Sequence, residues 1–343
     1  MEYPEVENGH IVPAGYLRGF ANSQMTMRHR VKLKHEKERR EKESSVRSVG
    51  TRKRPYSRTR PRDGSRIDDV EASISILENK VEIVRKAHER FPFCEGDRST
   101  VAQFAGAQQV RGPKRAREYA GLVDAVKAEA ENAGMSKTDA EHDARILASA
   151  TPRLISMQQW LYGFSALFFA MRWTLVEFAR PVLITCDHPV VLWDAVNRAC
   201  APVDLSGTGV NDLLEVRYPL NSTTCLLMTW LEGGDDSEVV RGNKTLARNI
   251  NSFTRAAAED EWFYKPGTKP PFSDERSRIL PLSTQIYGEY PNSRIVDRRR
   301  LGMKLAFETK DQPLRNAMSI KAYYPGTLAR CQRTGCSCES TTP

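Results

Sequence analysis

The residues with the clearest capacity for chemistry lie at the end of an apolar stretch, in the triplet Asp187-His188-Pro189. Side chains at strand ends are held by a rigid sheet, and such positions often carry function. Asp187 and His188 can act as acid and base, or bind a metal with another carboxylate. We expect His10 to join them as a catalytic group, and Arg18 to hold a phosphate or carboxylate through two hydrogen bonds. In the structural alternative, Asp187 caps a turn, His188 lies at the surface and Arg18 pairs with an acid.

A second positive cluster follows an apolar helical stretch, in the sequence Val-Arg-Gly-Pro-Lys-Arg-Ala-Arg that begins at Val110. Gly112-Pro113 interrupts a helix and exposes the cluster. Arg111 and Arg115 are therefore candidates for binding the phosphate of a substrate. The alternative interpretation is a solvated helix start.

The strongest electrostatic signal is the segment 28–66, which carries 16 Lys and Arg against 5 Asp and Glu, a net charge of +11. The whole chain has a net charge of +9, so the remainder has −2 and the basicity is local. Basic side chains neutralise phosphates and release counterions, which predicts sequence-independent binding of nucleic acid that weakens with salt. Tyr56 is the segment's only Phe, Trp or Tyr, so aromatic stacking on bases would contribute little to binding. The alternative is a solubilising insertion. The nucleic-acid-binding candidates are Arg52, Lys53, Arg54, Arg58, Arg60 and Arg62.

Other chemistry finds little support. The C-terminal run Cys331-x4-Cys336-x-Cys338 has one spacing too tight for structural zinc and no nearby His, so we interpret these residues as surface thiols. The sequence lacks a Walker phosphate loop, a dinucleotide-binding glycine motif, a His-Glu-x-x-His pair and a Gly-x-Ser-x-Gly elbow. We therefore predict no metal site, and the residues indicate no particular cofactor. Nucleotide kinases, nicotinamide-dependent enzymes and serine hydrolases are disfavoured.

The elements that must position these residues begin with helices. Apolar residues recur every three or four positions after Ile67, and Tyr16 to Phe20 has the same spacing. Within the basic segment, the mixed charges of residues 28–43 predict an exposed helix, and residues 51–66 are too polar to order. The further helices are predicted over 98–110, 116–132, 136–148, 152–171 and 243–259.

Strands are expected in the second half, where β-branched and apolar residues form short runs separated by turns. Short connections between the first three runs predict antiparallel neighbours, and Asn221-Ser222 predicts a tight turn. The pattern favours the α+β class, with a helical N-terminal half packed on an antiparallel β-sheet from the C-terminal half. The strands are predicted over 173–178, 182–185, 189–193, 215–220, 223–230 and 262–264.

Length and composition fit one large domain or two modest ones, with 343 residues of which 40% are hydrophobic. Seven cysteines without a secretory signal predict reduced thiols and a cytoplasmic protein. The longest apolar run is interrupted by polar residues, so we expect no membrane association. The expected units are an N-terminal motif segment belonging to the body (1–27), a basic, largely disordered arm (28–66), the α+β body (67–265) and an irregular C-terminal extension (266–343).

Several motifs in order resemble an uncharacterised bacterial family, the domain of unknown function numbered four-two-three-eight. The opening His10-Ile-Val-Pro, followed by Tyr16-Leu-Arg and Phe20, is similar to the family's His-Tyr-Val-Pro … Tyr-Leu-Arg-x-Phe. The family's Thr-Ser-Asp-Asn/His-Pro-Val resembles Thr185-Cys-Asp-His-Pro-Val, with Cys186 in the serine position. The other similar stretches are the helix at 104–111, Met171-Arg-Trp173, Tyr218-Pro-Leu220 and, more weakly, 249–264.

The resemblance spans residues 10 to about 264 and implies a fold and cytosolic residence more than an activity. Asn221-Ser222 stands where the family has Ser-Pro, and Cys186 stands where it has Ser. Both changes disfavour an essential serine at these two positions. The long basic arm also departs from the family pattern.

The residues leave open whether the chain is an enzyme, and they support three functions. The first is an enzyme acting on a phosphate-bearing substrate such as nucleic acid, in the manner of a defence or toxin-like nuclease. The second is a non-catalytic nucleic-acid-associated module that uses residues 28–66, and the third is a protein-interaction protein. The first depends on the opening segment lying against the Thr-Cys-Asp-His turn.

Overall fold

In the computed structural model, short strands and a short helix precede residue 69, helices occupy residues 69–170, and strands predominate after them. The structure describes residues 8–22, 25–30, 41–53, 58–59, 66–67, 69–194, 213–229, 238–272 and 282–287. The helices are α1 (Ala14–Leu17), α2 (Asp69–Glu78), α3 (Val81–Arg85), α4 (Ala87–Arg90), α5 (Glu95–Arg111), α6 (Pro113–Asn132), α7 (Lys137–Ala148), α8 (Ala150–Ala170), α9 (Lys244–Ala257) and α10 (Leu282–Tyr287), with a 3₁₀ turn η1 (Arg18–Phe20).

Helix ends follow local chemistry. Ser136 and Asn243 accept hydrogen bonds from the first free amides of α7 and α9 through their side chains. Gly112 ends α5, and Pro113 starts α6 at a position where a missing N–H costs nothing. The helices predicted over 98–110, 116–132, 136–148, 152–171 and 243–259 are therefore all present, with boundaries moved by a few residues.

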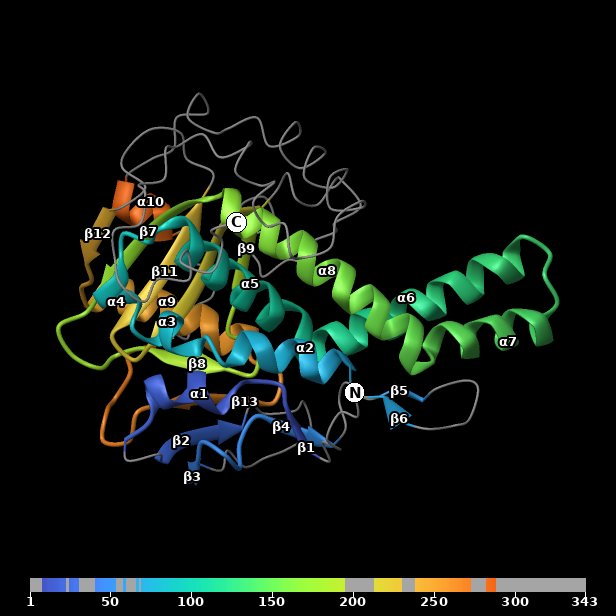
Figure 1. Ribbon diagram of the computed structural model, residues 1–343, viewed down its shortest axis with the longest axis horizontal. Coiled ribbons are helices and arrows are strands. Elements are labelled where there is room, and N and C mark those ends of the chain that lie inside the picture. The colour runs from blue at the N-terminus through green and yellow to red at the C-terminus, as the bar shows by residue number, and fades with distance from the viewer. Residues whose placement is uncertain are drawn as a thin grey trace, which may run out of the picture.

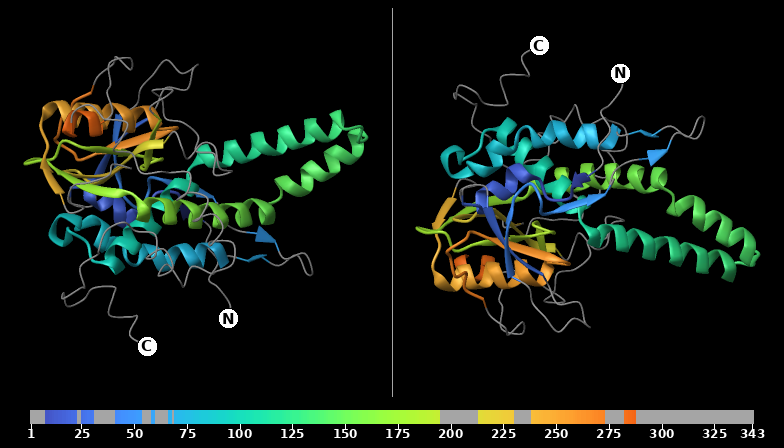
Figure 2. Two further views of the ribbon diagram at one scale, coloured as in Figure 1. Left: turned by 90° about the horizontal axis from the view of Figure 1, so that it is seen from above. Right: turned by 90° about the horizontal axis from the view of Figure 1, so that it is seen from below.

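A mixed five-stranded sheet forms the centre, with the strand order β12-β7-β11-β10-β9. All its pairs are antiparallel except β12 with β7, which are parallel. The sheet lies between α9 and α10 on one face and α5 and α8 on the other (Figure 2). Its strands are β7 (Arg172–Glu177), β9 (Val191–Asp194), β10 (Leu213–Asn221), β11 (Thr224–Thr229) and β12 (Glu238–Arg241).

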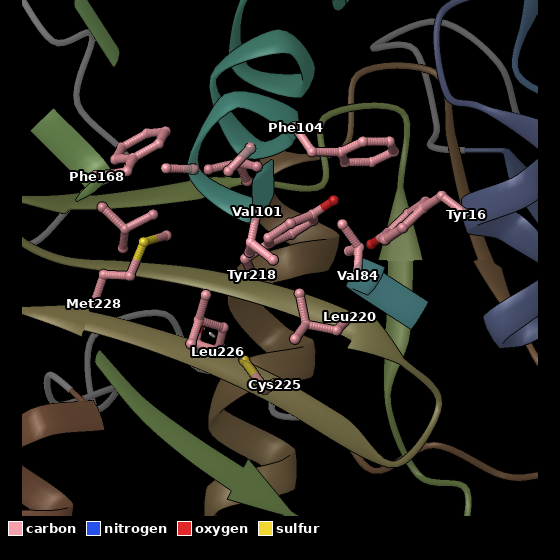
Figure 3. Close-up of a cluster of buried hydrophobic side chains, with 14 of the residues drawn as sticks. Tyr16, Val84, Val101, Phe104, Phe168, Tyr218, Leu220, Cys225, Leu226 and Met228 are labelled. Atoms are coloured by element: carbon pink, nitrogen blue, oxygen red, sulfur yellow. Dashed lines mark hydrogen bonds between the residues drawn. The ribbon is translucent and has the colours of Figure 1, made fainter. Parts of the chain in front are cut away.

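Alternation along β10 decides which side chains meet which helices. Tyr218 and Leu220 face the helix pair α5 and α8, where Phe104 and Phe168 complete an apolar layer (Figure 3). The ring of Tyr16, from the opening helix, stacks on Tyr218 with centroids 5.6 Å apart. The opening segment is thus part of the main core.

A second, four-stranded antiparallel sheet has the order β3-β2-β13-β8. Its strands are β2 (Met25–Arg30), β3 (Glu41–Ser45), β8 (Ile184–Cys186) and β13 (Glu261–Tyr264). The prediction that 182–185 pairs with the neighbouring runs was wrong, because β8 pairs with β13 while β7 and β9 belong to the other sheet. Residues from the N-terminal half also form strands, so the α+β class is confirmed but the division into a helical and a strand half is too simple.

The basic segment needs a correction within the described residues. Residues 28–30 belong to β2 and residues 41–43 to β3, where a helix over 28–43 was predicted. The pairing of β2 with β13 and of β3 with β2 overrides the helical preference of the local sequence. Residues 51–53 form β4, which pairs with β1 (Asn8–His10), so disorder over 51–66 is also contradicted there. A short pair, β5 (Arg58–Thr59) and β6 (Arg66–Ile67), lies further along.

Two helices leave the body as a hairpin. Helices α6 and α7 project together well beyond the sheets (Figures 1 and 2). The phenol of Tyr119 donates a hydrogen bond to the carbonyl of Leu147, 2.9 Å away, and this contact joins the two helices at their base. Among the described residues, no helix combines the length and the apolar character needed to span a membrane.

Candidate functional site

The end of α5 is where most of the predicted polar residues meet. The guanidinium of Arg111 is buried, with 1% of its side chain exposed, and its Nη1 donates to Glu78 Oε1 at 2.6 Å. Its Nη2 donates to the backbone carbonyl of His10. One arginine therefore joins the opening segment to the ends of α2 and α5. We call the set His10, Glu78, Arg111, Gly112 and His188 the polar junction.

The Asp187–His188 turn closes the other side of this junction. A Cβ atom on Gly112 would lie 3.0 Å from His188 Nδ1 and 3.3 Å from the carbonyl oxygen of Asp187. Such distances are tighter than ordinary packing, so a glycine lets the turn approach the helix end closely. Two residues before Asp187, the Oγ1 of Thr185 lies 2.8 Å from the Oη of Tyr16. The predicted approach of the opening segment to the Thr-Cys-Asp-His turn is thus present.

Asp187 itself has a clear structural task. Its buried carboxylate accepts backbone hydrogen bonds from Glu259, Asp260 and Glu261, at 2.9, 2.7 and 3.2 Å. These contacts fix the turn between α9 and β13. Burial raises the pKa of Asp187 to about 7, although the amide hydrogen bonds oppose the rise. This geometry matches the turn-capping alternative, and the acid–base role of Asp187 stays a prediction.

His10 is the better-placed acid–base group. Its Nδ1 is buried without a hydrogen-bond partner among the described residues. Burial lowers the pKa of His10 below its usual value, and the charge of Arg111 lowers it further, while Glu78 acts in the opposite direction. The imidazole is therefore neutral at pH 7 and can accept a proton. The side chain of Glu78 is 28% exposed, so the junction reaches solvent on that side.

Two predicted substrate-binding residues lie outside the junction. Arg18 is exposed in η1, and the carbonyl of its neighbour Gly19 accepts the amide of Ser222 at the β10–β11 turn. Arg115 is buried over the rings of Trp160 and Phe164. Its guanidinium also binds Glu118 at 2.5 Å, which explains its burial without a substrate.

The remaining predicted residues are only partly placed. Arg52 and Lys53 lie in β4 and Arg58 in β5, whereas Arg54, Arg60 and Arg62 lie outside the described residues. The cysteines of the C-terminal run also lie outside them. In the described part of the chain, no group of three or more His, Cys, Asp or Glu side chains is arranged to hold a metal.

A buried ion pair on the opposite face of β10 was missed from the sequence. Glu215 Oε1 accepts from both Nε and Nη2 of Arg217, with the Nε contact at 2.6 Å, and both side chains are fully buried. Arg217 Nη1 donates to Asn249 Oδ1 at 2.8 Å, and its guanidinium lies over the ring of Phe253 in α9. Glu215 Oε1 also accepts the amide of Leu282 in α10, 2.8 Å away. The available signal was a Glu-x-Arg pair inside an otherwise apolar strand.

These features define an α+β protein whose opening segment completes a polar junction against the edge of two sheets. The chain belongs to the family described as "Protein of unknown function (DUF4238)", whose model matches residues 8–268. The family resemblance inferred from the motifs is thereby confirmed. Comparison with curated proteins and with solved structures found no match in either set.

Proposed function

We propose that the protein is an enzyme that acts on a phosphate-bearing substrate, such as nucleic acid, at the polar junction. The observation that carries the proposal is the position of Arg111, whose buried guanidinium binds the partly exposed carboxylate of Glu78 beside His10. A carboxylate and a phosphate present similar oxygen pairs to a guanidinium. Glu78 therefore marks the place where a substrate phosphate would bind.

The chemistry follows from the charges at the junction. A substrate phosphate displaces the carboxylate of Glu78 and takes its hydrogen bond from Arg111 Nη1. Neutral His10 then accepts a proton from the attacking group or from water, as a general base does. Asp187 and His188 act as positioning residues in this proposal, because they shape the turn that packs on Gly112.

His10→Ala is the variant that tests this function. Wild-type protein and variant are compared in the hydrolysis of RNA, single-stranded DNA, double-stranded DNA and a nitrophenyl phosphodiester, each with and without Mg²⁺. We expect kcat to fall about 10²- to 10⁴-fold, the usual contribution of a general base. Because the pKa of His10 is lowered, wild-type activity should persist as the pH falls to 6.5 and be lost only below it.

The matched control is His88→Ala, since the His88 side chain is 46% exposed on α4, away from the junction. This variant should keep wild-type kcat, and thermal melts of both variants should show that the fold is intact. Wild-type protein that hydrolyses none of these substrates, or a folded His10→Ala variant with full activity, would refute the proposal.

The basic segment favours a second candidate function, the non-catalytic association with nucleic acid. Deleting 28–66 would remove half of β2 and all of β3 and β4 from the sheets, so replacement of charges is the cleaner test. Changing Arg54, Arg58, Arg60 and Arg62 to Gln should weaken binding to single-stranded DNA. The slope of log K against log salt should become shallower by about 3 units, because each lost phosphate contact contributes about 0.7. An unchanged slope, or no binding by the wild-type protein, rules this candidate out.

A further inference from the structure

A cleft beside the five-stranded sheet, lined by none of the polar junction residues, has the properties of a ligand site. It has a volume of about 620 Å³ and lies between the end of β7, the start of α9 and the loop that follows β13. Pockets of roughly 300–1,000 Å³ hold cofactor- and drug-sized molecules. The residues that shape it are Phe178, Arg180, Val182, Lys244, Ala247 and Lys269, together with backbone of Gly242 and Gly267.

The charge of the cleft is entirely positive. Arg180, Lys244 and Lys269 are exposed members of its lining, and the lining contains no Asp or Glu. Within the described residues, none of these three side chains has an ion-pair or hydrogen-bond partner. Three uncompensated cations around one cleft create a field that attracts and holds an anion.

The first turn of α9 strengthens this field without supplying the main contacts. Asn243 Oδ1 accepts the amides of Thr245 and Leu246, both at 2.9 Å, so two of the free helix amides are already satisfied. The positive end of the helix dipole still points toward the cleft, where Lys244 begins the helix. The cationic side chains must therefore carry most of the binding.

The floor of the cleft is apolar and its shape is fixed. Gly242 lies against the ring of Phe178 so closely that a Cβ atom there would be 2.3 Å from ring carbon Cε1. The amide of Gly242 also donates to the carbonyl of Glu177 at 2.7 Å, which holds the loop on the strand end. Phe178, Val182 and Ala247 give the same lining an apolar surface. A bare inorganic anion would leave that surface without a partner.

We infer that this cleft binds a phosphate ester that carries an apolar or aromatic group, as a nucleotide does. The phosphate would contact Arg180, Lys244 and Lys269, and the organic group would cover the apolar floor. The cleft shares no residue with the polar junction. The inference therefore holds whether or not the junction is catalytic.

The test is isothermal titration of the full-length protein with adenosine 5′-monophosphate, adenosine and inorganic phosphate. We expect adenosine 5′-monophosphate to bind at least fivefold more tightly than either of the other two. A decanucleotide with a 5′-phosphate, compared with the same decanucleotide with a 5′-hydroxyl, distinguishes a free nucleotide from a nucleic-acid end as the source of the ester.

Lys244→Glu and Lys269→Glu should each raise the Kd for adenosine 5′-monophosphate at least tenfold, because they replace an attraction by a repulsion. Lys137→Glu, at the tip of the α6–α7 hairpin, is the control for the same change of charge and should stay within twofold of wild type. Thermal melts confirm that the variants are folded. Binding that is undetectable at millimolar nucleotide, or equally strong in Lys244→Glu and Lys269→Glu, overturns the inference.

Discussion

Arg217→Met should lower the free energy of unfolding by about 3–5 kcal/mol, since removing one partner of a buried ion pair leaves an uncompensated charge. Glu215 and Arg217 are both fully buried, so neither can recover hydration when its partner is removed. Glu215 would keep the hydrogen bond from the amide of Leu282 but would lose both contacts with the guanidinium. Urea denaturation at pH 7, followed by the fluorescence of the tryptophans, measures the change.

Two further variants show whether the unpaired charge of Glu215 causes the destabilisation by Arg217→Met. The double change of Glu215→Leu with Arg217→Met removes both charges and should be less destabilising than Arg217→Met alone. Glu141→Gln breaks the exposed pair with Lys127 and should cost less than about 1 kcal/mol. A loss from Arg217→Met no larger than that from Glu141→Gln would show that the pair is not buried as described.

The second large effect is the contribution of Asp187 to the pH dependence of the free energy of unfolding. With a pKa of about 7 when folded, against an ordinary value of 3.8, Asp187 holds its proton more tightly in the folded state. Its contribution is therefore most favourable below pH 4, declines as the pH rises and is constant above about pH 7. Three pKa units at about 1.4 kcal/mol each give an upper limit of about 4 kcal/mol for this decline.

Comparison with Asp187→Asn isolates this contribution, because the amide cannot ionise and every other titrating group is shared. The free energy of unfolding of wild type minus that of Asp187→Asn should fall between pH 4.5 and pH 7 and then remain level. A difference that is level over this interval and falls only below about pH 4 would mean that the three backbone amides outweigh burial and hold the pKa of Asp187 below its ordinary value.

Local patterns predicted the elements well, and the pairing between distant elements poorly. Helix α8 and the hairpin of β10 and β11 follow from apolar spacing and from the turn at Asn221-Ser222, which are local properties. The partner of β8 was not predictable in this way, because β13 follows it by about 75 residues and only tertiary packing brings the two strands together. The same limit explains β2, whose charged sequence is paired by β13.

The candidate site was likewise predictable from the sequence only in part. Chain order and motif resemblance were enough to place the opening segment against the Thr-Cys-Asp-His turn, as the contact of Tyr16 with Thr185 shows. They could not assign the partner of Arg111, because Glu78 is chosen by how α2 packs on α5. Nor could they detect the cleft near Lys244, since its three cations come from segments that share no local pattern.

The docking of α10 has a consequence for anyone preparing fragments of this protein. The family match stops at residue 268, yet Leu282 lies fully buried and its backbone amide donates a hydrogen bond to the buried carboxylate of Glu215. A fragment trimmed to the matched region would lack α10, and water would reach the Glu215 carboxylate that is buried in the intact chain. Recombinant versions should therefore extend at least through Tyr287.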